Sequence, residues 1–105
     1  MALQNVLVTG GAGYIGSHVV YALIKTGQYK VISLDNYHNS LPEALVRVSK
    51  LARDELPADA SEEAIASTKV DAHQGDLTKP EQIRAVFERY GKGAIWGVVH
   101  IAVRS

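Results

Sequence analysis

A glycine-rich segment near the amino terminus constrains the fold of this chain most strongly. Residues 10–16 read Gly-Gly-Ala-Gly-Tyr-Ile-Gly, directly after the short apolar run of residues 5–9. Apolar residues then recur at helical spacing over residues 15–24, and Gly27 is expected to follow the end of this helix. A buried strand, a glycine turn and a helix in this order are the context in which such a segment binds the pyrophosphate of a dinucleotide. No Gly-Lys-Ser/Thr follows, which excludes a P-loop.

Each glycine of this segment has a physical task. Gly11, Gly13 and Gly16 satisfy G-x-G-x-x-G, and Gly10, Gly13 and Gly16 satisfy the wider G-x-x-G-x-x-G. One glycine permits the tight turn off the strand, the next lets the backbone approach a pyrophosphate, and the last packs the helix on the sheet. The amino end of the helix then presents free N–H groups to the phosphates. The alternative is a glycine turn with a structural role only.

Strands and helices alternate along the rest of the chain. We expect two capped helices, one opened by Ser40–Glu43 and running to about Arg53, the other opened by Thr78–Glu81 and closed by Gly91. Between them lies a loop with a short helical turn, and apolar strands are expected at residues 31–34, 70–74 and 96–102. The alternation predicts an α/β Rossmann fold, with a parallel sheet of about four strands in the order 3-2-1-4. The first two crossover helices should cover one face of the sheet and the third the other.

Composition narrows the classes of function. The 105 residues suffice for one small domain, and 11 Lys and Arg balance 11 Asp and Glu. We therefore expect no nucleic-acid or membrane partner. The absence of cysteine excludes disulfides and thiolate sites. The amino terminus has no basic flank typical of a signal peptide, so we expect a cytoplasmic protein.

Two aspartates follow predicted strands and are candidates for cofactor contacts. Asp35 ends the second strand, at the spacing where a carboxylate binds the hydroxyls of the adenosine ribose. It would repel a 2′-phosphate, and residues 36–38 contain no arginine, so NAD is favoured over NADP. Asp76 follows the third strand and could reach the adenine amino group. The alternatives are plain turn residues, with Asp76 beside the predicted helix cap at Thr78.

Four motifs carry a resemblance that spans nearly the whole chain. They lie at residues 9–18, 34–40, 75–77 and 98–102, and they include the run Asp-Asn-x-x-Asn-Ser. Together they resemble the extended short-chain dehydrogenase/reductase family, and within it the sugar-nucleotide epimerases. The resemblance implies a reaction in which bound NAD takes a hydride from C4 of the sugar, the 4-keto sugar turns over, and the hydride returns to the other face.

The resemblance also implies a set of cofactor contacts. The glycine segment would line the pyrophosphate, the residues after the second strand would hold the adenosine ribose and phosphate, Asp76 and its neighbour would frame the adenine, and two residues after the fourth strand would pass under the nicotinamide side. The full set is Gly10, Gly13, Tyr14, Ile15, Gly16, Asp35, Asn36, Asn39, Ser40, Asp76, Leu77, Ile101 and Ala102.

Two departures from the family pattern limit what the chain is expected to do. The family continues after residue 102 with a small residue and Leu-Lys, whereas this chain reads Val-Arg-Ser, so the expected cofactor-contacting lysine is missing. The family's catalytic Tyr-x-x-x-Lys and substrate domain lie further on. We therefore expect residues 1–105 to form a partial dinucleotide-binding domain without a substrate domain, a catalytic residue or turnover of its own. Two alternatives stay open: an active epimerase completed by sequence outside this chain, and an assembly module that keeps only the fold.

Other patterns in the sequence are interpreted as structural. Tyr21 and Lys25 fit Tyr-x-x-x-Lys, but they fall within the first helix, far from a nicotinamide ring. The four histidines lack metal-ligand spacing, so no metal site is expected. His100 is interpreted as a packed or hydrogen-bonded residue at a strand end. An incomplete domain would leave an apolar sheet face and a strand edge uncovered, which predicts self-association.

Overall fold

A computed structural model describes residues 3–10, 14–36, 43–76, 78–91 and 93–101. Its four strands form one parallel sheet in the order β3-β2-β1-β4, which confirms the predicted α/β topology. In chain order the elements are β1 (Gln4–Thr9), α1 (Tyr14–Lys25), β2 (Tyr29–Asp35), α2 (Glu43–Asp54), α3 (Glu62–Ser67), β3 (Asp71–Gln74), α4 (Pro80–Tyr90) and β4 (Ile95–His100).

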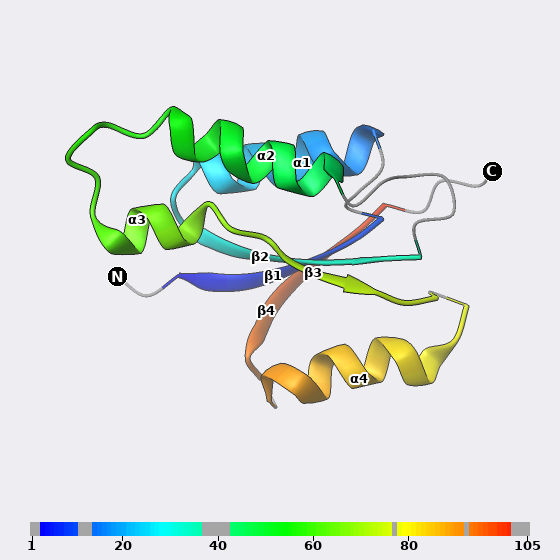
Figure 1. Cartoon of the computed structure of the whole chain (residues 1–105). Helices are drawn as coiled ribbons and strands as arrows, with labels where there is room; N and C mark the ends of the chain where they lie inside the picture. The colour runs from blue at the N-terminus through cyan, green and yellow to red at the C-terminus, as the bar shows by residue number, and fades with distance from the viewer. Residues whose placement is uncertain (1–2, 11–13, 37–42, 77, 92, 102–105) are drawn as a thin grey trace.

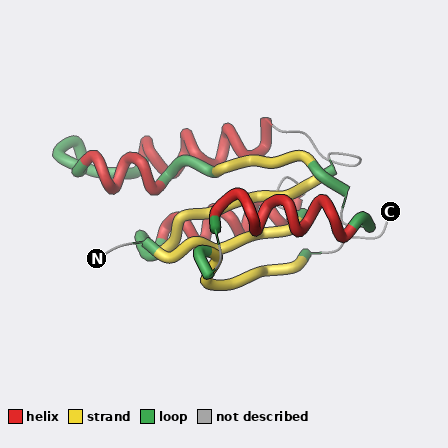
Figure 2. The backbone as a smooth tube through the Cα atoms, turned by 90° about the horizontal axis from the view of Figure 1, so that it is seen from below, coloured by secondary structure: helices red, strands yellow, loops and turns green. Residues whose placement is uncertain are grey.

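The helices cover both faces of the sheet. Figure 1 shows α1 and α2 above the sheet and α4 below it, as predicted for the first two crossovers and the third. Figure 2 shows the strands side by side from below. The short helix α3 lies toward the end of the sheet where β1 and β2 begin (Figure 1).

Alternation along the central strands builds two apolar clusters, one on each face. On the upper face Val6, Val8 and Val31 pack with Val20 of α1 and Leu45 of α2. On the lower face Leu7, Ile32 and Leu34 pack with Val86 of α4. The central strands β1 and β2 are thus buried from both sides, which explains why they read as continuous apolar runs rather than as alternating ones.

Strand β4 is covered less completely than the central strands. It pairs with β1 in parallel, with a shift in register after Asn5. Trp96 is 61% exposed and stacks on Tyr29 with 5.7 Å between ring centroids, and Val98 is 50% exposed. Val98 pairs with Leu7 of the lower cluster, so the lower face presents apolar surface to solvent at this edge of the described sheet.

The structure confirms the predicted glycines at the helix ends but corrects one of the predicted helix caps. Gly27 and Gly91 follow α1 and α4 with φ of 70° and 95°, a conformation that favours glycine. The predicted capping box at Thr78 is wrong, because α4 is capped by Lys79 without a side-chain hydrogen bond. Thr78 instead donates its hydroxyl hydrogen to Asp76. The predicted box at Ser40 lies outside the described residues.

Within the described residues, no helix is long and apolar enough to cross a membrane, since the longest have 12 residues where about 20 are needed.

Candidate functional site

The carboxyl ends of the parallel strands meet at one edge of the sheet. There β1 continues into Gly10, β2 ends at Asp35, β3 leads into Asp76, and β4 ends just before Ile101. The chain leaves β1 and β2 on one face and enters β4 from the other, so this edge is also the point where the direction of winding reverses. Ligands of open α/β sheets bind at such a point.

Gly10, the first residue of the glycine turn, lies between the ends of β2 and β4. The Gly10 N–H donates to the carbonyl oxygen of Leu34 at 2.9 Å, which ties the turn to β2. Gly10 has a φ of +74°, and a Cβ built on it would lie 2.4 Å from the carbonyl oxygen of Ile101. Both the backbone conformation and the close approach therefore require glycine at this position.

Thr9 joins the start of the glycine turn to the end of β4. Its hydroxyl oxygen lies 2.6 Å from Nδ1 of His100. The Ile101 N–H donates to both the carbonyl and the hydroxyl oxygen of Thr9, at 3.1 and 3.2 Å. His100 is thus a hydrogen-bonded residue at a strand end, as predicted. Sequence reasoning missed Thr9, because its contacts depend on a β1–β4 register that no local pattern reveals.

The amino end of α1 faces this edge. The helix begins at Tyr14, has 12 residues and carries no acidic residue in its first turn. Gly16 is buried in that turn, which lets the helix pack closely on the sheet, whereas Ile15 is exposed. Because the first N–H groups of a helix have no partner within it, this end has the partial positive charge that suits an anion.

Asp35 supplies the complementary acceptor. The residue is only 7% exposed although it is charged, and it ends β2 one position after the carbonyl group that binds Gly10. Its own carbonyl oxygen accepts from the Gly75 N–H at 3.0 Å, which joins the ends of β2 and β3. Asn36 follows it and is exposed. A helix terminus without acids and a carboxylate at the adjacent strand end fit the pyrophosphate and the ribose hydroxyls of a dinucleotide.

Asp76 is engaged in its own turn. Its Oδ1 accepts from the Thr78 hydroxyl at 2.6 Å and from the Thr78 N–H at 2.9 Å. The hydroxyl bond first, and then the N–H bond, lower the pKa of Asp76 below its usual value. The backbone N–H of Asp76 donates to Oε1 of Gln82 at 2.6 Å. The structure therefore realises the turn aspartate considered as an alternative, and contact with adenine remains a prediction.

The structure describes eight of the thirteen residues that were predicted to contact the cofactor. Gly13, Asn39, Ser40, Leu77 and Ala102 lie outside the described residues, as does the side chain of Tyr14. The described backbone of Gly10, Asp35, Asp76 and Ile101 gathers at the one edge, and α1 brings Tyr14, Ile15 and Gly16 to it.

The Tyr-x-x-x-Lys pair of α1 binds a different partner. The Tyr21 hydroxyl donates to Oε1 of Glu55, and Nζ of Lys25 lies 2.8 Å from Oε2 of the same carboxylate. The hydrogen bond to Glu55 raises the pKa of Tyr21 and also that of Lys25, while the Lys25 bond lowers the pKa of Glu55. The pair thus links α1 to the residue after α2. No three His, Cys, Asp or Glu residues of the described segments group closely enough to hold a metal ion.

A parallel 3-2-1-4 sheet with a glycine turn and a buried carboxylate at its switch point defines a Rossmann-type dinucleotide-binding fold. The chain belongs to the NAD dependent epimerase/dehydratase family, whose model matches residues 6–105.

Several of the similar proteins are UDP-glucose 4-epimerases. UDP-glucose 4-epimerase 3 of Oryza sativa subsp. japonica is 41% identical over 100 residues, which cover 93% of this chain and 22% of that protein. UDP-glucose 4-epimerase of Drosophila melanogaster is 42% identical over 96 residues, covering 86% and 23%. The crystal structure of the Bifidobacterium longum UDP-glucose 4-epimerase in complex with NAD+ and UDP superposes with a TM-score of 0.72 and 35% identity, over 97% of this chain and 25% of that one. The chain thus resembles the N-terminal part of these enzymes and spans about a quarter of their length.

Proposed function

We propose that this chain binds NAD at the carboxyl edge of its sheet and forms the dinucleotide-binding part of a UDP-glucose 4-epimerase. The observation that carries the proposal is the buried carboxylate of Asp35, one residue from the hydrogen bond that holds the Gly10 turn. NAD bound in the similar Bifidobacterium longum enzyme supports it. When bound, NAD would supply the hydride acceptor of the epimerase reaction.

The proposed contacts divide by the part of the cofactor they serve. The turn and the first residues of α1 would bind the pyrophosphate, with Gly10, Gly13, Tyr14, Ile15 and Gly16. The residues Asp35, Asn36, Asn39 and Ser40 would bind the adenosine ribose and phosphate, Asp76 and Leu77 would frame the adenine, and Ile101 and Ala102 would pass under the nicotinamide side.

Asp35 makes NAD the preferred cofactor over NADP. Its carboxylate accepts hydrogen bonds from ribose hydroxyls, but it would face the negative charge of a 2′-phosphate at close range. Because the carboxylate is largely withdrawn from water, that repulsion is screened less than at an exposed position.

Calorimetric titration of the chain with NAD and with NADP tests this proposal. Asp35→Ala should weaken NAD binding about 10- to 150-fold, because a hydrogen bond to a charged group contributes about 1.5–3 kcal/mol. The Asp35→Ala variant should also show a smaller preference for NAD over NADP. Asp59→Ala removes the same charge from an exposed loop and is the matched control.

Three outcomes of this titration would contradict the proposal in different ways. A folded chain that binds neither nucleotide would favour the assembly module, in which the glycine turn is architecture only. Equal affinities for NAD and NADP would remove the role of Asp35 in selection. Equal losses in Asp35→Ala and Asp59→Ala would mean that general charge, and not this position, governs binding.

We further propose that the 105 residues alone do not turn over a sugar nucleotide. The proposed site contains groups that bind a cofactor but no catalytic Tyr-x-x-x-Lys pair, since Tyr21 and Lys25 of α1 bind Glu55, the residue after α2. An assay for conversion of UDP-galactose to UDP-glucose with NAD present separates this proposal from the alternative of an active epimerase. Conversion by the purified chain would refute it.

We also propose that the isolated chain self-associates through the exposed side of β4. Val98 and Trp96 expose apolar surface there, and β4 has β1 as its only neighbour among the described strands. Sedimentation should show dimers that Val98→Lys disrupts and that Val46→Lys, the same change on α2, leaves intact. A monomeric wild-type chain would refute the association. A separate proposal is that the chain resides in the cytoplasm. A composition without cysteine suits a reducing compartment, and cell fractionation tests the location.

A further inference from the structure

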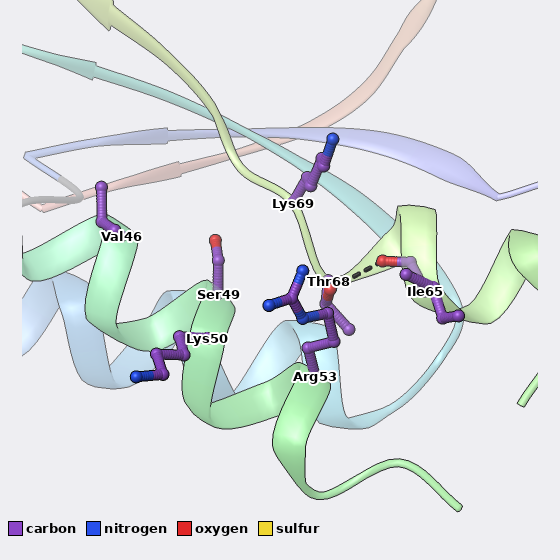
Figure 3. A pocket seen from close by; sticks show the side chains of 7 residues that line it. All are labelled: Val46, Ser49, Lys50, Arg53, Ile65, Thr68 and Lys69. Atoms are coloured by element: carbon purple, nitrogen blue, oxygen red, sulfur yellow. Dashed lines mark hydrogen bonds between the residues drawn. The ribbon is translucent and has the colours of Figure 1, made fainter. Parts of the chain in front are cut away.

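We propose that a hollow between α2 and α3 binds a small organic anion, in which a phosphate or carboxylate is joined to an apolar group. We call it the α2–α3 hollow. It has a volume of about 260 Å³ and is lined by Val46, Ser49, Lys50, Arg53, Ile65, Thr68 and Lys69 (Figure 3). It lies toward α3 and the beginning of β1 and β2, whereas the candidate NAD site lies where these strands end (Figure 1).

Positive charge is concentrated in the lining of the hollow, although the net charge of the chain is zero. The 11 cationic residues equal the 11 acidic ones, yet three cations and no acid line this hollow. The salt bridges among the described residues are Lys25–Glu55 and Lys30–Asp71, so none of the three lining cations takes part in them. Lys30 adds a fourth positive charge nearby, because its Nζ donates to the carbonyl oxygen of Lys69 at 2.8 Å, with Asp71 3.7 Å away as its counter-charge.

The side chains offer donors for an anion rather than acceptors. Figure 3 shows the guanidinium group of Arg53 extending from α2 toward Thr68, with Ser49 one turn earlier on the same helix. The Thr68 hydroxyl hydrogen is already donated to the carbonyl oxygen of Ile65 at 2.7 Å, so Thr68 does not donate to a ligand. The planar fork of Arg53 matches the oxygens of a carboxylate or phosphate. Ser49 provides a further donor, and Lys50 and Lys69 add charge, since their ammonium groups point away from Arg53 in Figure 3.

Two exposed apolar side chains indicate that the ligand also carries an apolar group. Val46 is 66% exposed and Ile65 is 39% exposed, and both belong to the same lining. An inorganic anion would leave them in water, whereas an anion with an apolar group would cover them and gain the free energy of that burial. The volume lies just below the range of about 300–1,000 Å³ that is usual for small-molecule pockets. A small metabolite-sized molecule therefore fits better than a peptide segment.

Three probes separate the contributions of charge and apolar surface. We would titrate the full chain with phenyl phosphate, inorganic phosphate and phenol, and follow the methyl NMR signals of Val46 and Ile65. Phenyl phosphate should bind more tightly than either of the others, because only it engages both kinds of surface. NAD added at saturation should leave this affinity unchanged, since the two sites lie at different ends of the sheet.

Substitution of the lining cations tests the location. Arg53→Gln and Lys69→Gln should each weaken phenyl phosphate binding about two- to fivefold, the range expected for partly exposed ion pairs. Arg47→Gln removes the same charge from an exposed position of α2 outside the lining and should leave the affinity unchanged. Denaturant unfolding of each variant shows whether it remains folded.

Several results would overturn the proposal. One is equal weakening by Arg47→Gln and Arg53→Gln, which would indicate diffuse attraction to a basic helix. Another is phenyl phosphate that shifts the Gly10 amide signal but not the methyl signals, which would assign it to the pyrophosphate site. A third is binding to vesicles with anionic lipid that depends on Arg53 while phenyl phosphate does not bind, which would make the hollow part of a membrane contact.

Discussion

Gly10→Ala tests the geometry of the glycine turn through stability, without any assumption about ligand. Alanine at a φ of +74° is strained, which costs about 1–2 kcal/mol. The new methyl group would also lie 2.4 Å from the carbonyl oxygen of Ile101, so the turn or the end of β4 must shift. Forced overpacking of this kind costs a further ~1–3 kcal/mol. We therefore expect Gly10→Ala to lower the free energy of unfolding by about 2–5 kcal/mol.

Gly27→Ala separates the two contributions. Gly27 has nearly the same φ, +70°, but a Cβ there meets no heavy atom within 4 Å. This control should lose only the ~1–2 kcal/mol of backbone strain. The measurement is unfolding by urea at 25 °C for the wild type and both variants, with the slope checked for constancy. A domain of this size has about 5–15 kcal/mol of stability, so Gly27→Ala should remain folded, and Gly10→Ala should remain folded unless the stability lies at the lower end of that range.

The difference between the two variants decides the question. A larger loss in Gly10→Ala supports the close contact between the turn and the end of β4. Equal losses would refute it, because the only shared feature is the positive φ. The turn would then tolerate a side chain, and the case for a turn held rigidly beside the proposed pyrophosphate site would fail.

Three further changes have expected outcomes. Glu55→Gln should lower the pKa of Tyr21 toward 10.0, measured by phenolate absorbance. The pKa of Glu55 is lowered in the folded state, so this carboxylate stabilises the fold above pH 4.5, its ordinary pKa, and that stabilisation is lost on acidification. The free energy of unfolding of Glu55→Gln should therefore fall less steeply with decreasing pH than that of the wild type. Tyr90→Phe should cost about 1–2 kcal/mol in urea unfolding by removing the 3.0 Å bond to Asp71 and the 2.7 Å contact with Nε2 of His73. Burial raises the pKa of Tyr90 to about 12 from 10.0, so its stabilisation is present below pH 10 and lost between pH 10 and 12, a loss that the variant should lack. Ser33→Ala removes a buried hydroxyl without a hydrogen-bond partner among the described residues, so thermal unfolding should show unchanged stability or a gain of up to about 1 kcal/mol; a larger loss would imply an unrecognised partner.

The sequence alone determined the order of elements, the strand order of the sheet and the position of the glycine turn. These follow from local rules: continuous apolar runs for β1 and β2, helical spacing for α1 and α4, and glycines at Gly27 and Gly91 where helices end. The alternation of strands and helices then leaves few topologies, because parallel crossovers are right-handed. The capping box at Thr78 failed for a local reason, since Thr78 turns its hydroxyl toward Asp76 two residues earlier and Lys79 takes the cap position.

Only the tertiary structure decided which residues meet across the sheet. The contact of Thr9 with His100 spans 91 positions, and that of Glu55 with Tyr21 spans 34. Likewise, Lys69 and Arg53 line one hollow because the segment after α3 returns beside the end of α2. Such contacts depend on strand register and helix packing, which are set by the burial of whole faces and not by any short pattern. The sequence therefore indicates a dinucleotide-binding fold and the sheet edge at which the ligand is expected. The α2–α3 hollow and the contacts of Gly10 with the ends of β2 and β4 form only when the chain is folded.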